Sequence, residues 1–235
     1  MPKTVLITGA NRGVGLELLK QIHKAGFCCI GGYRDADRAE ELLQMQADDP
    51  ERVIALPCEV TSEQSLQAMA AALEPRVHAI DILINNAGVL NNDEPSGEKI
   101  ARSVLQHTLD VNLIGPILTT QTFLPFLRRG TLKKLVFISS IMGSINLNKS
   151  GSLPSYRISK AALNQFCRSM ALELAPEGVV TLAVHPGWAQ TDMGGPQANL
   201  PVTESAAGIV ELLRQAAPAT HNGRFFDYTG RELAW

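Results

Sequence analysis

The chain has 235 residues, of which 45% are hydrophobic and 19% are charged, and these proportions are ordinary for a globular protein with a sizeable core. A formal net charge of -2 excludes the basic footprint of a nucleic-acid-binding domain, and no apolar run is long enough for a membrane span. The four cysteines lie in apolar segments without metal-ligand spacing. They predict reduced core thiols and a cytoplasmic setting.

Short β-branched runs alternate with helical patterns along almost the whole chain. The expected strands are Lys3–Ile7, Phe27–Tyr33, Arg52–Pro57, Ile80–Ile84, Lys134–Ser139, Val179–His185 and Arg224–Phe226. The expected helices are Val14–Ala25, Asp37–Gln46, Ser62–Leu73, Glu98–Leu127, Ser155–Ala175 and Glu204–Ala216. This alternation predicts a single α/β domain over residues 1–235, a Rossmann-type doubly wound parallel sheet of about seven strands between two helical layers.

The connections between these elements indicate where a ligand would bind. Thr61 and Gln64 have the spacing of a capping box, which marks one helix start. Three connections rich in Gly, Pro, Asn and Ser follow strands, over Ala87–Gly97, Ile141–Pro154 and Pro186–Pro201. Open α/β sheets bind ligands at the carboxyl ends of their strands, so we expect the site among these three connections.

A glycine-rich turn follows the first expected strand and opens the first helix. Gly9, Gly13 and Gly15 have the spacing Gly-x-x-x-Gly-x-Gly. Bare backbone and a helix N-terminus at such a turn suit a pyrophosphate, because N–H groups approach it closely and the helix end carries partial positive charge. The turn predicts a dinucleotide site, although a tight strand-to-helix turn alone would also explain the glycines.

The charges after the second strand favour NADP(H) over NAD(H). An NAD site would offer a carboxylate about 20 positions after the glycines, but this region holds Tyr33 followed by Arg34. Arg12 adds a second cation, and guanidinium groups bind a 2′-phosphate bidentately. Asp35 and Asp37 weaken this prediction, and the alternative for Arg34 is a solvated surface arginine.

Tyr156 and Lys160 are four residues apart at the start of an expected helix, so their side chains share one helix face. A lysine cation beside a phenol favours ionisation of the phenol, and we expect it to lower the tyrosine pKa. Together with a nucleotide-binding turn, this pair predicts redox chemistry at a carbonyl.

Six segments follow one another along nearly the whole chain. They are Thr8–Gly15, Asn85–Gly88, Asn112 within Asp-Val-Asn-Leu, Ile138–Gly143, Tyr156–Lys160 and His185–Trp188. In this order they resemble the short-chain dehydrogenase/reductase family, in its C-factor-like and carbonyl-reductase branch.

The resemblance implies a proton relay of four residues. Tyr156 would be the general acid in reduction and the base in oxidation, and Lys160 would lower its pKa and bind the nicotinamide ribose. Ser140 would donate to the substrate oxygen as charge develops on it, and Asn112 would hold the water that links Lys160 to solvent. Ser140 is preferred over Ser139 because Gly143 follows it by three residues.

The glycine turn, the arginines and the resemblance together give the expected cofactor contacts. They are Gly9, Asn11, Arg12, Gly13, Val14, Gly15, Arg34, Glu59, Val60, Asn86, Ala87, Gly88, Tyr156, Lys160, Pro186, Gly187 and Thr191. Two features depart from the family pattern. Glu59 stands where the family has Asp against the adenine, and the stretch between Ser140 and Tyr156 is longer than usual.

Other residue types give weaker signals. The five histidines are scattered without metal-ligand spacing, so no metal site is expected. Ser140 lacks the Gly-x-Ser-x-Gly turn of a hydrolase nucleophile. Trp188, Met193 and Leu200 could form an apolar substrate wall.

The sequence therefore predicts an NADPH-dependent reductase of small aldehydes or ketones that also oxidises alcohols, with no nucleic-acid or membrane partner. Two alternatives stay open: a nucleotide-binding signalling protein with little turnover, and an NAD-linked alcohol dehydrogenase. The resemblance also implies a homo-oligomer, a dimer or tetramer paired through the two long helices, although other members of the family are monomeric.

Overall fold

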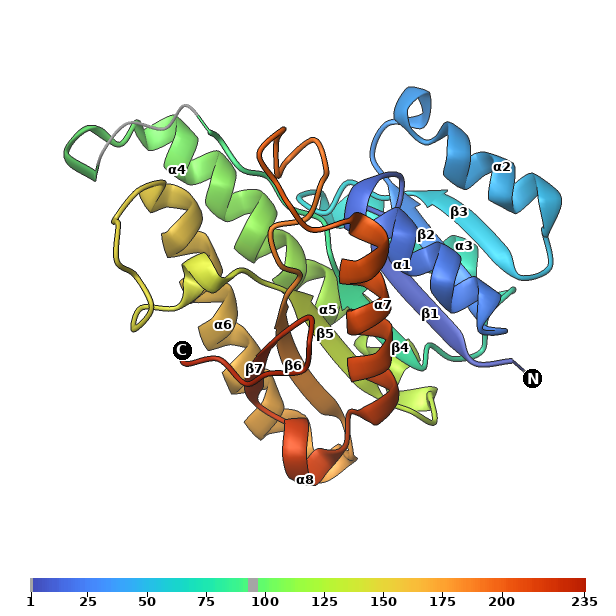
Figure 1. The fold of residues 1–235 in the computed structure, drawn as a ribbon. Helices are drawn as coiled ribbons and strands as arrows, with labels where there is room; N and C mark the ends of the chain where they lie inside the picture. Colours follow the sequence, from blue (N-terminus) through green and yellow to red (C-terminus); the bar gives the residue numbers. More distant parts are fainter. Residues whose placement is uncertain (1, 93–96) are drawn as a thin grey trace.

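The computed structural model describes residues 2–92 and 97–235. Their strands form one parallel sheet of seven strands in the order β3-β2-β1-β4-β5-β6-β7 (Figure 1). The α/β fold expected from the sequence is thereby confirmed. The strands are β1 Thr4–Thr8, β2 Cys28–Tyr33, β3 Val53–Pro57, β4 Ile82–Asn85, β5 Lys134–Ile138, β6 Val180–His185 and β7 Arg224–Asp227.

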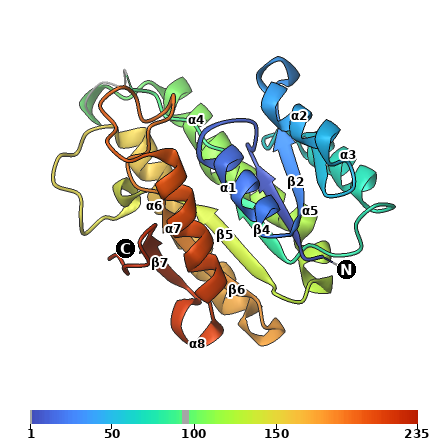
Figure 2. The same cartoon turned by 45° about the vertical axis from the view of Figure 1, so that its right-hand side comes forward.

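Helices cover both faces of the sheet, as the two views show (Figures 1 and 2). They are α1 Gly13–Lys24, α2 Glu40–Asp48, α3 Glu63–Leu73, α4 Arg102–Leu109, α5 Gly115–Arg129, α6 Pro154–Leu174, α7 Val202–Gln215 and the short α8 Pro218–His221. The apolar side chains of α1, α2 and α7 pack on one face, and those of α3, α5 and α6 pack on the other. No helix among the described residues is long and apolar enough to cross a membrane.

Consecutive apolar residues in the strands explain this double covering. In β1, Leu6 joins one core cluster while Val5 and Ile7 join the other. The same alternation occurs in β4, where Leu83 and Ile84 lie on opposite faces. Successive side chains of a strand point to opposite faces, so a strand that is apolar at every position must be covered on both.

The segment expected to form one long helix, Glu98–Leu127, is divided in the structure. Gly97–Lys99 form a separate 3-10 turn, and the helix begins at Arg102. A π-helical segment, Asp110–Ile114, interrupts it before α5. Segments of this kind insert an extra residue into a helix turn and commonly occur at functional sites.

The expected capping box at Thr61 and Gln64 is wrong by one residue. Ser62 caps α3, because its hydroxyl accepts a hydrogen bond from the Ser65 amide at 3.2 Å. The Thr61 hydroxyl instead donates to Glu59 at 2.9 Å. Thr61 and Ser62 are both residue types that cap helices, and the hydrogen bond from the Ser65 amide shows that Ser62 is the cap.

The sheet order places the site. β1 lies between β2 and β4, and the connection after β1 forms α1 on one face while α5, which follows β4, covers the other. When the connections after two neighbouring strands turn to opposite faces of the sheet, a crevice forms between them. The three irregular connections follow β4, β5 and β6, which are neighbours in the sheet. Residues 93–96 of the first connection lie outside the described part of the chain.

Candidate active site

A cavity of about 940 Å³ opens at the carboxyl edge of the sheet, where residues that follow β1, β4 and β5 line it, and this volume is in the range of a cofactor or ligand site. Of the expected site residues, only Asn112 is absent from its lining, because it lies fully buried behind the wall. The expected residues that line it are Gly9, Asn11, Arg12, Gly13, Val14, Gly15, Arg34, Glu59, Val60, Asn86, Ala87, Gly88, Ser140, Tyr156, Lys160, Pro186, Gly187 and Thr191.

The glycine turn needs its glycines for two different reasons. Gly9 and Gly13 have φ angles of 63° and 55°, a left-handed backbone that favours glycine. A Cβ on Gly15 would lie 2.3 Å from the Gly9 carbonyl oxygen, so this position requires close backbone approach. The Asn86 amide ties the turn to β4, donating to the Thr8 and Gly9 carbonyls at 2.9 and 3.0 Å.

Arg34 and Glu59 face each other across the ends of β2 and β3. The Arg34 Nε atom lies 3.8 Å from Glu59 Oε2. The other carboxylate oxygen of Glu59 accepts from the Thr61 amide at 3.2 Å and from its hydroxyl at 2.9 Å. The longer glutamate side chain therefore folds back over its own turn, where it holds the guanidinium at the edge of the cavity.

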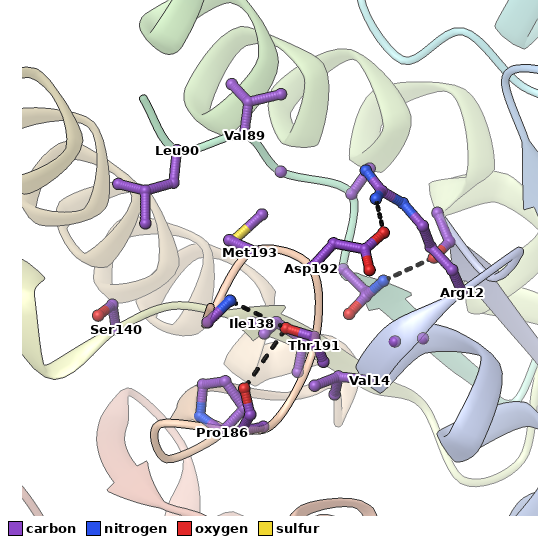
Figure 3. Close-up of a pocket in the computed structure, with 18 of the residues that line it drawn as sticks. Arg12, Val14, Val89, Leu90, Ile138, Ser140, Pro186, Thr191, Asp192 and Met193 are labelled. Carbon is purple, nitrogen blue, oxygen red and sulfur yellow. Dashed lines mark hydrogen bonds and ion pairs between the residues drawn. The ribbon is translucent and has the colours of Figure 1, made fainter. Parts of the chain in front are cut away.

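Arg12 has a partner that the sequence did not indicate. Its guanidinium forms an ion pair with Asp192, which lies 180 positions later in the connection after β6 (Figure 3). The neighbouring Thr191 also approaches the glycine turn, since a Cβ on Gly13 would lie 3.2 Å from its methyl group. The connection after β6 thus lies against the glycine turn.

Sequence reasoning missed a third arginine at this end of the cavity. Arg38 lines the cavity, and its carbonyl oxygen accepts from the Asn11 side chain at 2.9 Å. In contrast to Arg12 and Arg34, its guanidinium has no carboxylate within ion-pair distance among the described residues. The Asp35 carboxylate caps the turn that carries Arg38, because it accepts a hydrogen bond from the Asp37 amide at 3.1 Å. The signal available in the sequence was the cluster of charges that follows the second strand.

Ser140, Tyr156 and Lys160 meet at the centre of the cavity wall. Ser140 follows β5, and Tyr156 and Lys160 lie one turn apart near the start of α6. A side-chain hydrogen bond joins Ser140 to Tyr156. The Lys160 ammonium donates to the Ile138 carbonyl at 2.9 Å and lies 5.7 Å from the centre of the Tyr156 ring.

The adjacent Ser139 has a different environment. Its hydroxyl donates to the Asn164 side chain at 2.6 Å inside the core. The sequence preference for Ser140 rested on Gly143, and the structure shows what this glycine does. A Cβ on Gly143 would lie 2.8 Å from the Lys160 backbone, so the turn after Ser140 can press against α6 only because this residue lacks a side chain.

Burial shifts both titratable groups of the pair. It raises the pKa of Tyr156 to about 12, against a smaller lowering by the hydrogen bond with Ser140. Burial also lowers the pKa of Lys160 to about 8. The expectation that Lys160 lowers the tyrosine pKa is therefore not met, because the loss of hydration on burial is the largest effect and only the hydrogen bond with Ser140 opposes it. Near pH 7 the pair is a neutral phenol beside an ammonium group, which is the state that can donate a proton.

Asn112 lies in the π-helical segment and joins several parts of the site. Its side-chain oxygen accepts from the Val89 amide at 2.8 Å, and its amide group donates to the Val89 carbonyl at 2.9 Å. The same amide group donates to Ser159 at 3.0 Å, and Ser159 donates to the Tyr156 carbonyl at 2.8 Å. Ser159 was missed in the sequence because it reads as one more helix residue between Tyr156 and Lys160.

The remaining candidates have clear positions. His185 lines the cavity, and burial lowers its pKa to about 4, so its ring is neutral near pH 7. Among residues 2–92 and 97–235, no three His, Cys, Asp or Glu side chains gather in a group that could hold a metal. Trp188 and Met193 line the cavity, but Leu200 does not. Leu200 packs on Gly187 instead, where a Cβ would lie 2.3 Å from its methyl group.

Comparison with known proteins places the chain in a family. Residues 3–199 match the family model described as short chain dehydrogenase. Over 156 residues the chain is 45% identical to C-signal of Myxococcus xanthus, an alignment that covers 66% of this chain and 93% of that protein.

Solved structures share the whole architecture. An NADPH-bound carbonyl reductase from chicken fatty liver superposes with a TM-score of 0.93 and 31% identity, covering 100% of this chain and 99% of the other. The carbonyl reductase Sniffer of D. melanogaster gives 0.92 and 29%, covering 100% of both chains. The chain belongs to the short-chain dehydrogenase family, a family of oxidoreductases.

Proposed function

We propose that the protein is an NADPH-dependent carbonyl reductase that converts aldehydes or ketones to alcohols and catalyses the reverse oxidation. The observation that carries this proposal is the hydrogen-bonded pair of Ser140 and Tyr156, with the buried Lys160 beside them, in the wall of a cavity that a glycine turn closes at its other end. In this proposal residues 1–235 act as one nucleotide-binding domain.

The residues at the glycine end fit a phosphorylated dinucleotide. The turn at Gly9 and Gly13 exposes backbone at the start of α1, where a helix N-terminus stabilises a pyrophosphate. Arg34 and Arg38 supply cations beyond the ends of β2 and β3, which suits a 2′-phosphate. The NADPH-bound chicken carbonyl reductase, which has nearly the same fold, supports the same assignment.

When bound, NADPH supplies the hydride, and the protein supplies orientation and a proton. The Ser140 hydroxyl donates a hydrogen bond to the substrate oxygen, and Tyr156 delivers its phenolic proton to that oxygen as negative charge develops there. Lys160 stabilises the resulting phenolate electrostatically. Asn112 and Ser159 hold the backbone of α6 and of the segment after β4 in register with this pair.

The test is NADPH oxidation with a panel of aldehydes and ketones, comparing wild type with Tyr156→Phe. Loss of the phenolic proton should lower kcat by at least about hundredfold, the usual scale of general acid catalysis. Tyr33→Phe is the matched control, because Tyr33 packs against the core and does not line the cavity. Equal turnover by wild type and Tyr156→Phe would contradict the proposal.

The similarity to C-signal favours a second candidate. In it, the protein binds the nucleotide tightly and acts as a signal without significant turnover. Calorimetric NADPH binding together with no reduction of any carbonyl in the panel would support this alternative. The third reading, an NAD-linked alcohol dehydrogenase, expects better binding of NADH and no change of cofactor preference in Arg34→Ala.

A further inference from the structure

The cavity has a second end whose chemistry differs from the cofactor end. Beyond Ser140 and Tyr156 it is lined by large apolar side chains from the three irregular connections. We call this set the apolar arm. Its residues are Val89, Leu90, Ile141, Leu153, Trp188 and Met193.

Trp188 is held in place by its own loop. Its indole Nε1 donates to the Gly194 carbonyl at 2.8 Å, and the Gly194 amide donates to the Thr191 hydroxyl at 3.1 Å. A Cβ on Gly194 would lie 2.1 Å from the Ala189 carbonyl oxygen, so this tight turn requires glycine. The only polar atom of the ring is thus satisfied internally, while 52% of the residue is exposed.

The opposite wall is also fixed. Both backbone polar groups of Val89 are bonded to the buried Asn112 side chain, which sets the position of the segment that carries Val89 and Leu90. Figure 3 shows these two residues across from Met193, with Ser140 at the side of the space between them. Two walls held by hydrogen bonds form a slot that a ligand does not need to organise.

Charge is divided between the two ends of the cavity. Its charged lining residues lie around the glycine turn and the ends of β2 and β3, except for Lys160 at the junction. The described part of the apolar arm contributes no charged side chain, and Asp192, which precedes Met193 in the chain, is paired with Arg12 at the glycine turn. A carboxylate placed in this arm would lose hydration without gaining a fixed cationic partner.

We propose that the apolar arm selects uncharged carbonyl compounds that carry a flat aromatic group, with Trp188 as the residue that determines this specificity. The inference rests on the proposed function. An aromatic ring that lies in the slot, against the wall of Trp188 and Met193, gains both buried area and favourable ring and sulfur contacts. The carbonyl at its end is then within reach of Ser140 and Tyr156.

The experiment compares two aldehydes of similar shape, para-tolualdehyde and para-carboxybenzaldehyde, with propanal as a substrate without a ring. For wild type, kcat/KM should be about hundredfold higher for the neutral aryl aldehyde than for the carboxylated one, since a desolvated carboxylate is costly. Trp188→Ala should lower the tolualdehyde value by roughly tenfold and leave propanal within about twofold. Trp188→Phe keeps a flat ring without the bond to Gly194 and should fall in between.

The controls separate this inference from the proposed function. Trp235→Ala changes the chain's other tryptophan, which does not line the cavity. This change should not alter the ratio of kcat/KM for para-tolualdehyde to that for propanal. NADPH binding should be the same in all variants. If wild type reduces both aryl aldehydes equally well, the inference is wrong while the proposed function stands. The same holds if Trp188→Ala leaves the tolualdehyde-to-propanal ratio of kcat/KM unchanged.

A binding measurement decides the inference even without turnover. The unreactive amides para-toluamide and para-carboxybenzamide are titrated calorimetrically into the NADPH-loaded protein. Tighter binding of the neutral amide, lost in Trp188→Ala, supports the inference. Equal binding of both amides, or binding of neither, overturns it. Absence of carbonyl reduction by wild type contradicts only the proposed function.

Discussion

The two ends of the cavity are built in different ways. At the cofactor end, most of the lining residues come from the segments directly after β1, β2 and β3, and most of those are charged or are glycines. At the other end, the apolar arm comes from the long connections after β4, β5 and β6. A nucleotide presents phosphates that require backbone amides and cations at fixed points, whereas an apolar group requires only a surface of suitable shape.

This difference explains which end the sequence describes better. A glycine turn and a nearby arginine are local patterns that a few consecutive residues are enough to recognise. The apolar arm depends on side chains that are distant in the chain, such as Leu90 and Met193, and that meet only after folding (Figure 3). The following predictions test whether the two ends are functionally separate, beginning with the residues at their junction.

Lys160→Met should have the largest effect because Lys160 lies at the junction. We expect turnover to fall by at least about hundredfold, as for the loss of an acid–base group. The fold should become more stable at pH 7, with Tm higher by about 3 °C, since the variant no longer buries an ammonium group. Steady-state kinetics and thermal unfolding measure the two effects.

The Tm difference between Lys160→Met and wild type should depend on pH. The lysine pKa is near 10.5 in the unfolded chain and about 8 in the folded one. Below pH 8 the folded protein therefore buries a charged ammonium group, which lowers the free energy of unfolding by the full amount. As pH rises from 8 to 10.5 this cost disappears, and the Tm advantage of Lys160→Met should shrink over the same window. An advantage that grows with pH would contradict the assignment.

Lys134→Met provides the matched control. Lys134 is also a buried lysine whose pKa is lowered by burial, but it starts β5 at the opposite edge of the sheet, where it donates to the Leu213 carbonyl. Turnover should stay within about twofold of wild type, because this residue does not line the cavity.

Arg34→Ala should affect the cofactor end alone. We expect NADPH to bind about tenfold more weakly, the scale of a lost charge-assisted hydrogen bond, while NADH binding stays unchanged. The ratio of kcat/KM for neutral and carboxylated aldehydes should not move. Arg224→Ala is the control, because Arg224 is also paired with a glutamate but lies outside the cavity. A change in aldehyde selectivity would show that the two ends are coupled.

Asp192→Asn should have the smallest effect. Exposed ion pairs contribute little, so release of Arg12 from Asp192 should tighten NADPH binding by about twofold to fivefold. The gain should be largest at low salt, since screening weakens both interactions. Glu232→Gln, which breaks the comparable pair with Arg224, should leave NADPH binding unchanged. Weaker binding in Asp192→Asn would mean that the ion pair helps to hold the connection after β6 over the cofactor.

The sequence by itself determined the order of strands and helices, the glycine turn, and the four-residue spacing of Tyr156 and Lys160. Every expected strand boundary lies within two residues of the observed one. These features are local: periodicity, turn residues and helix spacing act over a few positions, so a single chain displays them directly.

Only the tertiary structure decided which distant groups meet and how deeply they are buried. It paired Arg12 with Asp192, joined Asn112 to both Val89 and Ser159, and removed Leu200 from the cavity wall. It also reversed the expected pKa change of Tyr156. The hydration of a side chain depends on its position in three dimensions, so the effect of burial on Tyr156 and Lys160 could be assigned only once the fold had placed them inside.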